Sequence, residues 1–272
     1  MALTEIQSEI LFIISASRID GGESYVAGGT ALNFLLERPR LSRDIDLFHD
    51  TREALARTWQ SDRTLLERAA FHVGTIRELP GLVEAVVSKG KASTLVQWAL
   101  DSAFRFFPLI RDEVLGLALH PFDLATNKVL ALVGRLEARD WIDVLGCHER
   151  LQELGYLTWA ACGKDPGLNP ELILNEANRS GRYTHEEIAS LGFKGPPPDA
   201  GSLAQEWKRM LAQAGKIIAL LPYEKVGTCV LSASGGLFRG DPSQLENQLR
   251  TDAVIFHPGC IRGAFPSFPG DT

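Results

Sequence analysis

Two carboxylates and two glycines with different chemical uses lie within one short stretch of this chain, residues 25–49. Asp44 and Asp46 are separated by one residue, so a strand there would place both carboxylates on one face and Ile45 on the other. Without a cation the two carboxylates repel one another, whereas a magnesium ion lets both stay ionised. The pair therefore predicts a divalent-metal site, with a solvated edge strand as the alternative.

The glycines precede the carboxylates, at the end of a short apolar run. Gly28, Gly29 and Thr30 lie where a predicted strand passes into a predicted helix. Backbone N–H groups there are not obstructed by side chains and lie at the positive end of a helix dipole, which suits a phosphate. The alternative is an ordinary tight turn between strand and helix. Neither GxxxxGK[ST] nor GxGxxG is present, so the stretch is not one of those two nucleotide-binding motifs.

A second group of charged residues lies in the segment 123–143. On one continuous helix, four of its members would fall within a sector of roughly 80°; they are Lys128, Arg135, Arg139 and Asp143. The cations can neutralise phosphate oxygens, and the acid can orient a base or hold a neighbouring side chain. The alternative is a solvated helix face with Arg–Asp pairs that add little stability.

Hydrophobic periodicity predicts the elements that must position these residues. The pattern is helix, strand, helix, strand, helix and then three strands, the last two joined as a hairpin through Lys89-Gly90-Lys91. The predicted elements are a helix after Thr4, strand 25–27, a helix opened by Thr30 and ended by Pro39, strand 44–48, helix 51–70 and strands 71–79, 83–88 and 93–100. We therefore expect a mixed sheet flanked by helices.

Helical spacing dominates the rest of the chain. We expect Asp123 to cap a helix over 124–145, with a possible break near Gly134 or at 139–140. Further helices are expected at 170–177, 185–191 and 202–221, while the Gly- and Pro-rich segment 222–272 shows no clear pattern. The sequence thus predicts an α/β (α+β) fold, with a core over residues 1–150 and a mostly helical region over 151–272.

Composition excludes several classes of protein. The chain has 272 residues, of which 45% are hydrophobic and 23% charged, and a net charge of −6, which argues against a generally basic protein that coats nucleic acid. Its four cysteines form no CxxC pair, so neither a zinc ribbon nor a disulfide framework is indicated. No basic leader and no apolar run long enough to span a bilayer is visible, and we expect a cytoplasmic protein without membrane contact.

Glycines about one helix before a pair of carboxylates are the layout of the polymerase-β-like nucleotidyltransferases. Within them, the sequence resembles the AbiEii/AbiGii-type nucleotidyltransferase toxins through GGTAL at 28–32 and RLSRDIDLF at 40–48. The segment 123–143 is similar to the family pattern D-L-x-x-x-K-x-x-A-L-x-x-R-x-x-x-R-D-x-x-D. Beyond about residue 165 the resemblance is only general.

This resemblance implies a polymerase-β-like core and a role for each matching residue. Asp44 and Asp46 would bind Mg²⁺ (or Mn²⁺), Lys128 would steady the transferring phosphoryl group, and Asp143 would be the acid of the fourth motif. The residues that would bind the nucleotide are Gly28, Gly29, Thr30, Ser42, Arg135 and Arg139.

The resemblance also implies a reaction and its partners. A nucleoside monophosphate would pass from an NTP to an acceptor hydroxyl. The acceptor that the resemblance implies is RNA, in particular the tRNA 3′ end. The protein would be the toxin of a bacterial toxin–antitoxin or phage-defence system, with a cognate antitoxin protein as partner.

The sequence departs from the family at one position. A later strand usually carries a third carboxylate, in a pattern like V-D-L-A-x-D-S-P-F-R, whereas this chain reads VQWALDSAFR over 96–105 with Gln97 at the acid position. An amide oxygen can coordinate a metal but brings no charge and cannot act as a general base. Asp101 would lie roughly 13 Å further along the strand, so Asp143 is the other candidate for the missing acid.

Two further functions therefore stay open. One is a catalytically weak protein that binds a nucleotide or a partner on the same fold, and the other is nucleotidylation of a protein hydroxyl.

Overall fold

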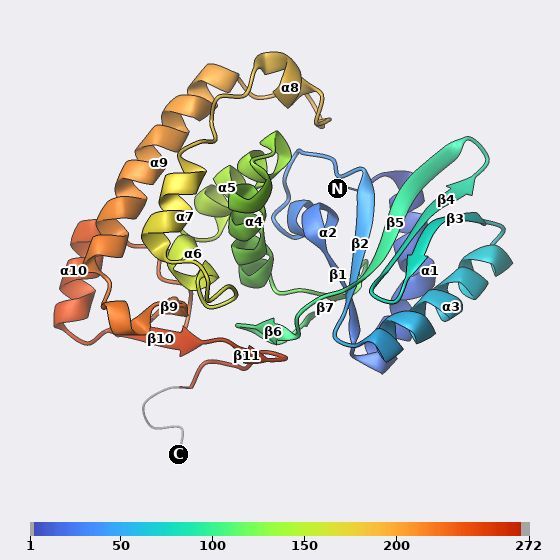
Figure 1. The fold of residues 1–272 in the computed structure, drawn as a ribbon, viewed down its shortest axis with the longest axis horizontal. Coiled ribbons are helices and arrows are strands. Elements are labelled where there is room, and N and C mark those ends of the chain that lie inside the picture. Colours follow the sequence, from blue (N-terminus) through green and yellow to red (C-terminus); the bar gives the residue numbers. More distant parts are fainter. Residues whose placement is uncertain (1–2, 268–272) are drawn as a thin grey trace. The chain divides into compact units, whose positions relative to one another are not determined.

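The computed structural model describes residues 3–267, which form two compact units (Figure 1). The first unit contains the chain up to residue 103 together with 109–120 and 192–195, and the second contains 104–108, 121–191 and the chain from 196 onward. The boundary predicted at residue 150 lies after the last sequence motif, whereas the compact units are defined by contacts in the fold. The boundary stays a prediction.

The first unit is built on a seven-stranded mixed sheet of order β3-β4-β5-β2-β1-β8-β7. Its elements are α1 (Glu5–Gly21), β1 (Ser24–Ala27), α2 (Gly28–Leu35), β2 (Asp44–His49), α3 (Arg52–Arg68), β3 (His72–Leu79), β4 (Leu82–Lys89), β5 (Ala92–Leu100), β7 (Ile110–Asp112) and β8 (Gly116–Ala118). Strand β2 pairs antiparallel with β1 and parallel with β5. The prediction of a mixed sheet flanked by helices, including the β4–β5 hairpin, is confirmed.

Alternation along β2 decides which side chains face the core. Ile45 and Leu47 are fully buried, whereas Asp44 and Asp46 are half-buried on the opposite face. Helices α1 and α3 pack against one another and against the sheet (Figure 1). Thr4 begins α1 with a capping box, and the hydroxyl of Thr51 accepts from Ala54 N at the start of α3.

A buried polar group joins α1, α3 and β5. Arg18 donates to both carboxylate oxygens of Asp62 and to Ile14 O at 2.6 Å, and the indole of Trp98 donates to Asp62 Oδ2 at 2.7 Å. Both charged side chains are fully buried. One carboxylate therefore satisfies donors from two other elements of the unit.

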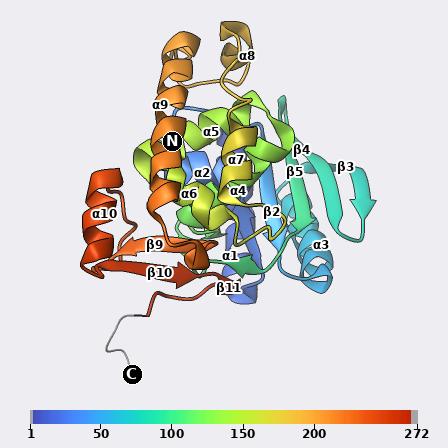
Figure 2. The same cartoon turned by 60° about the vertical axis from the view of Figure 1, so that its left-hand side comes forward.

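The second unit is mostly helical. Its elements are β6 (Phe104–Arg105), α4 (Pro121–Arg135), α5 (Ala138–Arg150), α6 (Leu154–Ala161), α7 (Pro170–Ala177), α8 (His185–Ala189), α9 (Ala200–Leu220), a 3₁₀ turn (Tyr223–Lys225), β9 (Thr228–Ser232), α10 (Pro242–Arg250), β10 (Val254–Pro258) and β11 (Cys260–Ile261). Helix α9 runs beside α6 and α7, and its Ile217 packs with Tyr156, Trp159 and Val230 in one apolar cluster (Figure 2).

Two details of the second unit differ from the prediction. The helix expected over 124–145, with a break considered near Gly134 or at 139–140, is two helices, and the break lies between those positions, at Leu136, where φ is 54°. Asp123 is not a cap, since α4 already begins at Pro121, a residue suited to the first helical position. The carboxylate of Asp123 instead accepts from the backbone N–H groups of Phe106 and Phe107 and pairs with Lys164 at 2.8 Å.

Within residues 222–267, the tail that showed no clear sequence pattern contains a 3₁₀ turn, helix α10 and strands β9, β10 and β11. Its strands β9 and β10 pair antiparallel on either side of α10. None of the helices between residues 3 and 267 is both long and apolar enough to cross a bilayer.

Candidate active site

The glycine turn and the second carboxylate of β2 are in direct contact. Gly28 has φ of 64°, and a Cβ added there would lie 1.6 Å from Asp46 Oδ2. The carboxylate therefore occupies the space that a side chain at position 28 would need. Ala27, the residue before α2, gives no side-chain cap, so the first N–H groups of the helix are left for another acceptor.

A second contact lies over the next glycine. A Cβ at Gly29 would lie 2.7 Å from Arg40 Nη2 and 3.1 Å from Ser42 Oγ. Ser42 donates to Asp44 Oδ1 at 2.9 Å, and the hydroxyl of Thr30 donates to the backbone oxygen of Asp44. The glycines, the two hydroxyl residues and Asp44 thus form one connected group, together with the buried Arg40. Nucleotide binding by this group stays a prediction.

The register of the sheet places a row of polar side chains beside Asp46. Gln97 on β5 is the parallel partner of Asp46, and Glu84 on β4 is the antiparallel partner of Gln97. Gln97 Nε2 donates to Glu84 Oε1 at 2.7 Å, and Arg77 on β3 pairs with the other oxygen of Glu84 at 3.3 Å. Sequence reasoning missed Glu84. The predicted turn Lys89-Gly90-Lys91 would pair position 84 with 96, whereas the observed turn has two residues, pairs Lys89 with Ala92 and so brings Glu84 opposite Gln97.

The residues on β2 fit a divalent ion held jointly with a substrate. Within residues 3–267 no group of three or more His, Cys, Asp or Glu side chains could hold a metal by itself. Mg²⁺ usually binds one or two carboxylates and completes its coordination with water and substrate phosphates. The two carboxylates of β2, beside a turn suited to phosphate, match that chemistry.

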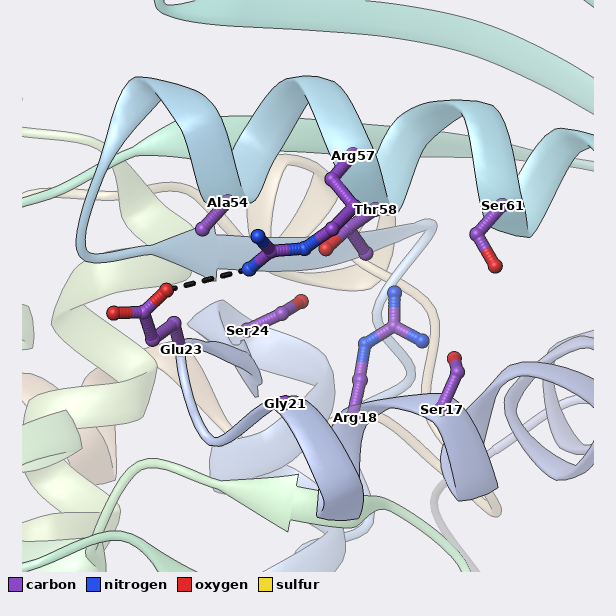
Figure 3. A pocket seen from close by; sticks show the side chains of 9 residues that line it. All are labelled: Ser17, Arg18, Gly21, Glu23, Ser24, Ala54, Arg57, Thr58 and Ser61. Carbon is purple, nitrogen blue, oxygen red and sulfur yellow. Dashed lines mark hydrogen bonds and ion pairs between the residues drawn. The ribbon is translucent and has the colours of Figure 1, made fainter.

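A polar pocket in a different part of the first unit is less suited to phosphate. It lies between α1 and α3, has a volume of about 150 Å³ and contains Arg18 and Arg57 (Figure 3). Arg18 is already paired with Asp62, and Arg57 reaches Glu23 at 3.4 Å. Each cation of this pocket is therefore matched by a carboxylate.

In the second unit, the residues predicted from the segment 123–143 form a network of ion pairs. Lys128 Nζ lies 3.1 Å from Asp140 Oδ1 and 3.0 Å from Asp143 Oδ2. Arg135 donates to both oxygens of Asp140, at 3.1 and 2.9 Å. Arg139 pairs instead with Glu137 at 2.6 Å. Because both aspartates are fully buried, they hold the Lys128 ammonium in place.

Two solved structures are similar to this chain. MenT4, a nucleotidyltransferase toxin from Mycobacterium tuberculosis, is 14% identical, with a TM-score of 0.53 over 80% of this chain and 85% of that chain. JHP933 from Helicobacter pylori is 15% identical, with a TM-score of 0.48 over 80% of this chain and 95% of that chain. The likeness to MenT4 shows a shared fold. A search of curated proteins finds no match.

One protein family matches the sequence itself. Residues 16–115 match the family described as "Nucleotidyl transferase AbiEii toxin, Type IV TA system". The matched segment contains both glycines, both carboxylates of β2 and Gln97, and it ends before Lys128. The resemblance found in the sequence is therefore confirmed over residues 16–115, where the chain is similar to the AbiEii nucleotidyltransferase toxin family.

Proposed function

We propose that this nucleotidyltransferase transfers a nucleoside monophosphate from an NTP to an acceptor hydroxyl, using Mg²⁺ or Mn²⁺ bound by Asp44 and Asp46. One observation carries the proposal, the carboxylate of Asp46 seated against the α-carbon of Gly28 at the uncapped start of α2. That contact joins a pair of metal-binding carboxylates to a phosphate-binding turn within the first unit.

Several residues of the first unit would each contact a different part of the triphosphate. The N–H groups of Gly28 and Gly29 and the hydroxyl of Thr30 would donate to phosphate oxygens, and Arg40 would add a positive charge. Ser42 keeps the Asp44 carboxylate oriented through its 2.9 Å hydrogen bond and would also contact the nucleotide. A divalent cation bound there would neutralise charge on the phosphate oxygens.

The chemistry needs positioning and charge neutralisation more than a covalent intermediate. The acceptor oxygen forms a bond to the α-phosphorus, and the bond from that phosphorus to the bridging oxygen breaks. Pyrophosphate leaves with the electron pair, and the hydroxyl proton passes to solvent water. Gln97 cannot accept that proton, because an amide is not a general base.

We assign Lys128 the role of steadying the phosphoryl group, with Asp143 and Asp140 as its positioning residues. The assignment rests on the family motif and on the two ion pairs at 3.0 and 3.1 Å that fix the ammonium. Arg135 and Arg139 are the further proposed contacts to the nucleotide. Of these two, Arg135 shares Asp140 with Lys128.

The acceptor and the partner are proposed from the family. We propose RNA, with the tRNA 3′ end as the first substrate to test, and a cognate antitoxin protein encoded by a neighbouring gene. A small adjacent reading frame whose product relieves growth arrest by this chain would support the toxin assignment.

The test is transfer of label from an α-labelled NTP to RNA in the presence of Mg²⁺. We expect labelled RNA with the wild-type chain and none with Asp46→Asn. Glu53→Gln, which removes an exposed carboxylate in the first turn of α3, is the matched control and should act like the wild type. Equal labelling by wild type and Asp46→Asn would show that the catalytic assignment is wrong.

Gln97 supports one alternative, a catalytically weak protein that binds nucleotide on the same fold. That alternative predicts saturable NTP binding without product, and a gain of activity in Gln97→Asp. Nucleotidylation of a protein hydroxyl is distinguished by mass spectrometry, because it adds a nucleotide to the mass of the chain or its partner and leaves RNA unlabelled.

A further inference from the structure

Gln97 lies between two carboxylates on neighbouring strands. Its register partners are Asp46 on β2 and Glu84 on β4, so all three side chains project from the same face of the sheet. Adjacent strands lie about 4.8 Å apart, which places the amide within side-chain reach of both acids. The orientation of that amide therefore decides whether its carbonyl oxygen or its NH₂ group faces Asp46.

Glu84 determines this orientation. A carboxylate can only accept hydrogen bonds, so the group that Gln97 turns toward Glu84 at 2.7 Å must be its NH₂. The carbonyl oxygen Oε1 then points away from Glu84. No residue in the described part of the chain donates a hydrogen bond to it. The oxygen is left as an acceptor on the face that carries Asp46.

Glu84 is itself held in place. Arg77, its register partner on β3, lies 3.3 Å from the carboxylate oxygen that Gln97 does not use. The Glu84 side chain is only 16% exposed, whereas that of Arg77 is 56% exposed. The three side chains form a chain of contacts that runs across β3, β4 and β5 and ends at the Gln97 oxygen.

We propose that Gln97 Oε1 is a third oxygen ligand of the divalent cation and that Glu84 is the positioning residue that presents it. This inference rests on the proposed function, because it requires a cation at Asp44 and Asp46. The amide supplies a hard oxygen donor, and Glu84 keeps a negative charge on the next strand.

Binding of Mn²⁺ to the full-length chain, followed by electron paramagnetic resonance, tests the inference without relying on activity. Gln97→Met removes the oxygen, and Glu84→Gln leaves the amide free to turn either way; each should weaken Mn²⁺ binding by roughly tenfold or more. Glu78→Gln, an exposed charge on β3, is the matched control and should leave binding unchanged. Thermal unfolding checks that each variant is folded.

A double-mutant cycle separates positioning from simple charge. If Glu84 acts through Gln97, Glu84→Gln should cause no further loss in the Gln97→Met background. The reversed pair, Glu84→Gln with Gln97→Glu, keeps the hydrogen bond and should recover wild-type binding. Wild-type affinity in Gln97→Met, an undiminished effect of Glu84→Gln in that background, or no recovery in the reversed pair would overturn the inference.

Failure of the proposed function gives a different result. If Asp46→Asn loses Mn²⁺ binding, the assignment of a metal site to Asp46 stands, whatever the Gln97 variants show. Equal binding by wild type and Asp46→Asn would remove the metal site itself, and the role of Gln97 with it.

Discussion

At the scale of single residues, the site depends on the absence of a side chain at position 28. The Asp46 carboxylate occupies the space of that missing Cβ. It can therefore lie against the turn only because residue 28 is a glycine. A strand–helix turn elsewhere in a protein needs glycine for its backbone angle alone. Here the contact adds a second reason, which ties the phosphate-binding turn to the carboxylate pair.

Comparing two glycines separates the effect of the positive φ from the effect of the contact with Asp46. Gly28 and Gly90 have φ of 64° and 62°, but an added Cβ has nothing within 4 Å at Gly90. Both alanine variants should lose about 1 kcal/mol of stability from backbone strain. Only Gly28→Ala should displace Asp46, with a roughly 100-fold loss of nucleotide transfer. Unfolding and transfer assays on both variants check this, and equal activity would contradict it.

His49, at the end of β2, makes the first unit sensitive to acid. Burial lowers its pKa from 6.5 to about 4, with Nδ1 placed to donate to Ala99 O and Nε2 to accept from Ser24 Oγ. As pH falls, His49 is protonated in the unfolded chain before it is protonated in the folded chain. The free energy of unfolding should therefore fall by about 3 kcal/mol between pH 6.5 and pH 4. Denaturant unfolding against pH measures the slope.

Two histidine variants test the source of this slope. His49→Gln should flatten the dependence between pH 6.5 and 4, whereas His72→Gln, at an exposed position of β3, should leave it as in the wild type. A slope that persists in His49→Gln would assign the acid sensitivity to another group.

Residue types alone predicted the glycines and the carboxylate pair, because their chemistry depends on neighbours in sequence. Arg40 and Glu84 reach their places through tertiary contacts. Arg40 folds back over Gly29, and Glu84 meets Gln97 across a hairpin. The predicted three-residue turn places the hairpin register one residue out. The role of the pairing also depends on Asp46, which lies on the next strand.

At the scale of elements, a buried ion pair holds the helical layer to the sheet. Arg18 from α1 and Asp62 from α3 share their hydrogen bonds with Trp98 from β5. A buried pair contributes little net free energy when intact, but a single partner left in the core costs much more. The pair therefore specifies how α1, α3 and β5 fit together.

Removing one or both charges distinguishes these effects. Asp62→Leu leaves the Arg18 guanidinium buried without its carboxylate and should lower the free energy of unfolding by about 3–5 kcal/mol. The double variant Arg18→Met with Asp62→Leu should lose less. Glu67→Gln, in the exposed pair with Arg63 on the same helix, should leave stability unchanged. A double variant less stable than Asp62→Leu would contradict this account.

Periodicity predicted most elements, and its errors have a local cause. Apolar spacing continues from α4 into α5, so a periodic pattern does not reveal the turn at Leu136, a residue type that seldom adopts positive φ. In the tail, β9 and β10 are five residues each and are separated by α10. Short strands far apart in the chain leave little alternation to detect.

At the scale of the whole molecule, the two units exchange segments. Residues 104–108 belong to the second unit between parts of the first, and 192–195 return to the first. The returning segment hydrogen-bonds the stretch that carries Arg40, since Leu41 N donates to Gly192 O at 3.1 Å and Lys194 N to Pro39 O at 2.8 Å. A segment of four residues is too short to show a sequence pattern, so motifs alone could not predict that residues 192–195 pack beside the stretch that carries Arg40.

A chain cut after residue 150 tests whether the motif-bearing part is independent. It would keep both motifs but lose Gly192–Gly195 beside Pro39 and Leu41, and strand β6 would lose its partner β11. Helices α4 and α5 would also lose the apolar surfaces of α6 and α7. We expect this fragment to lack a cooperative thermal transition and to bind NTP more weakly than the full chain. A fragment that unfolds cooperatively and binds NTP as the full chain does would show that residues 1–150 form an independent domain, as their motifs alone suggest.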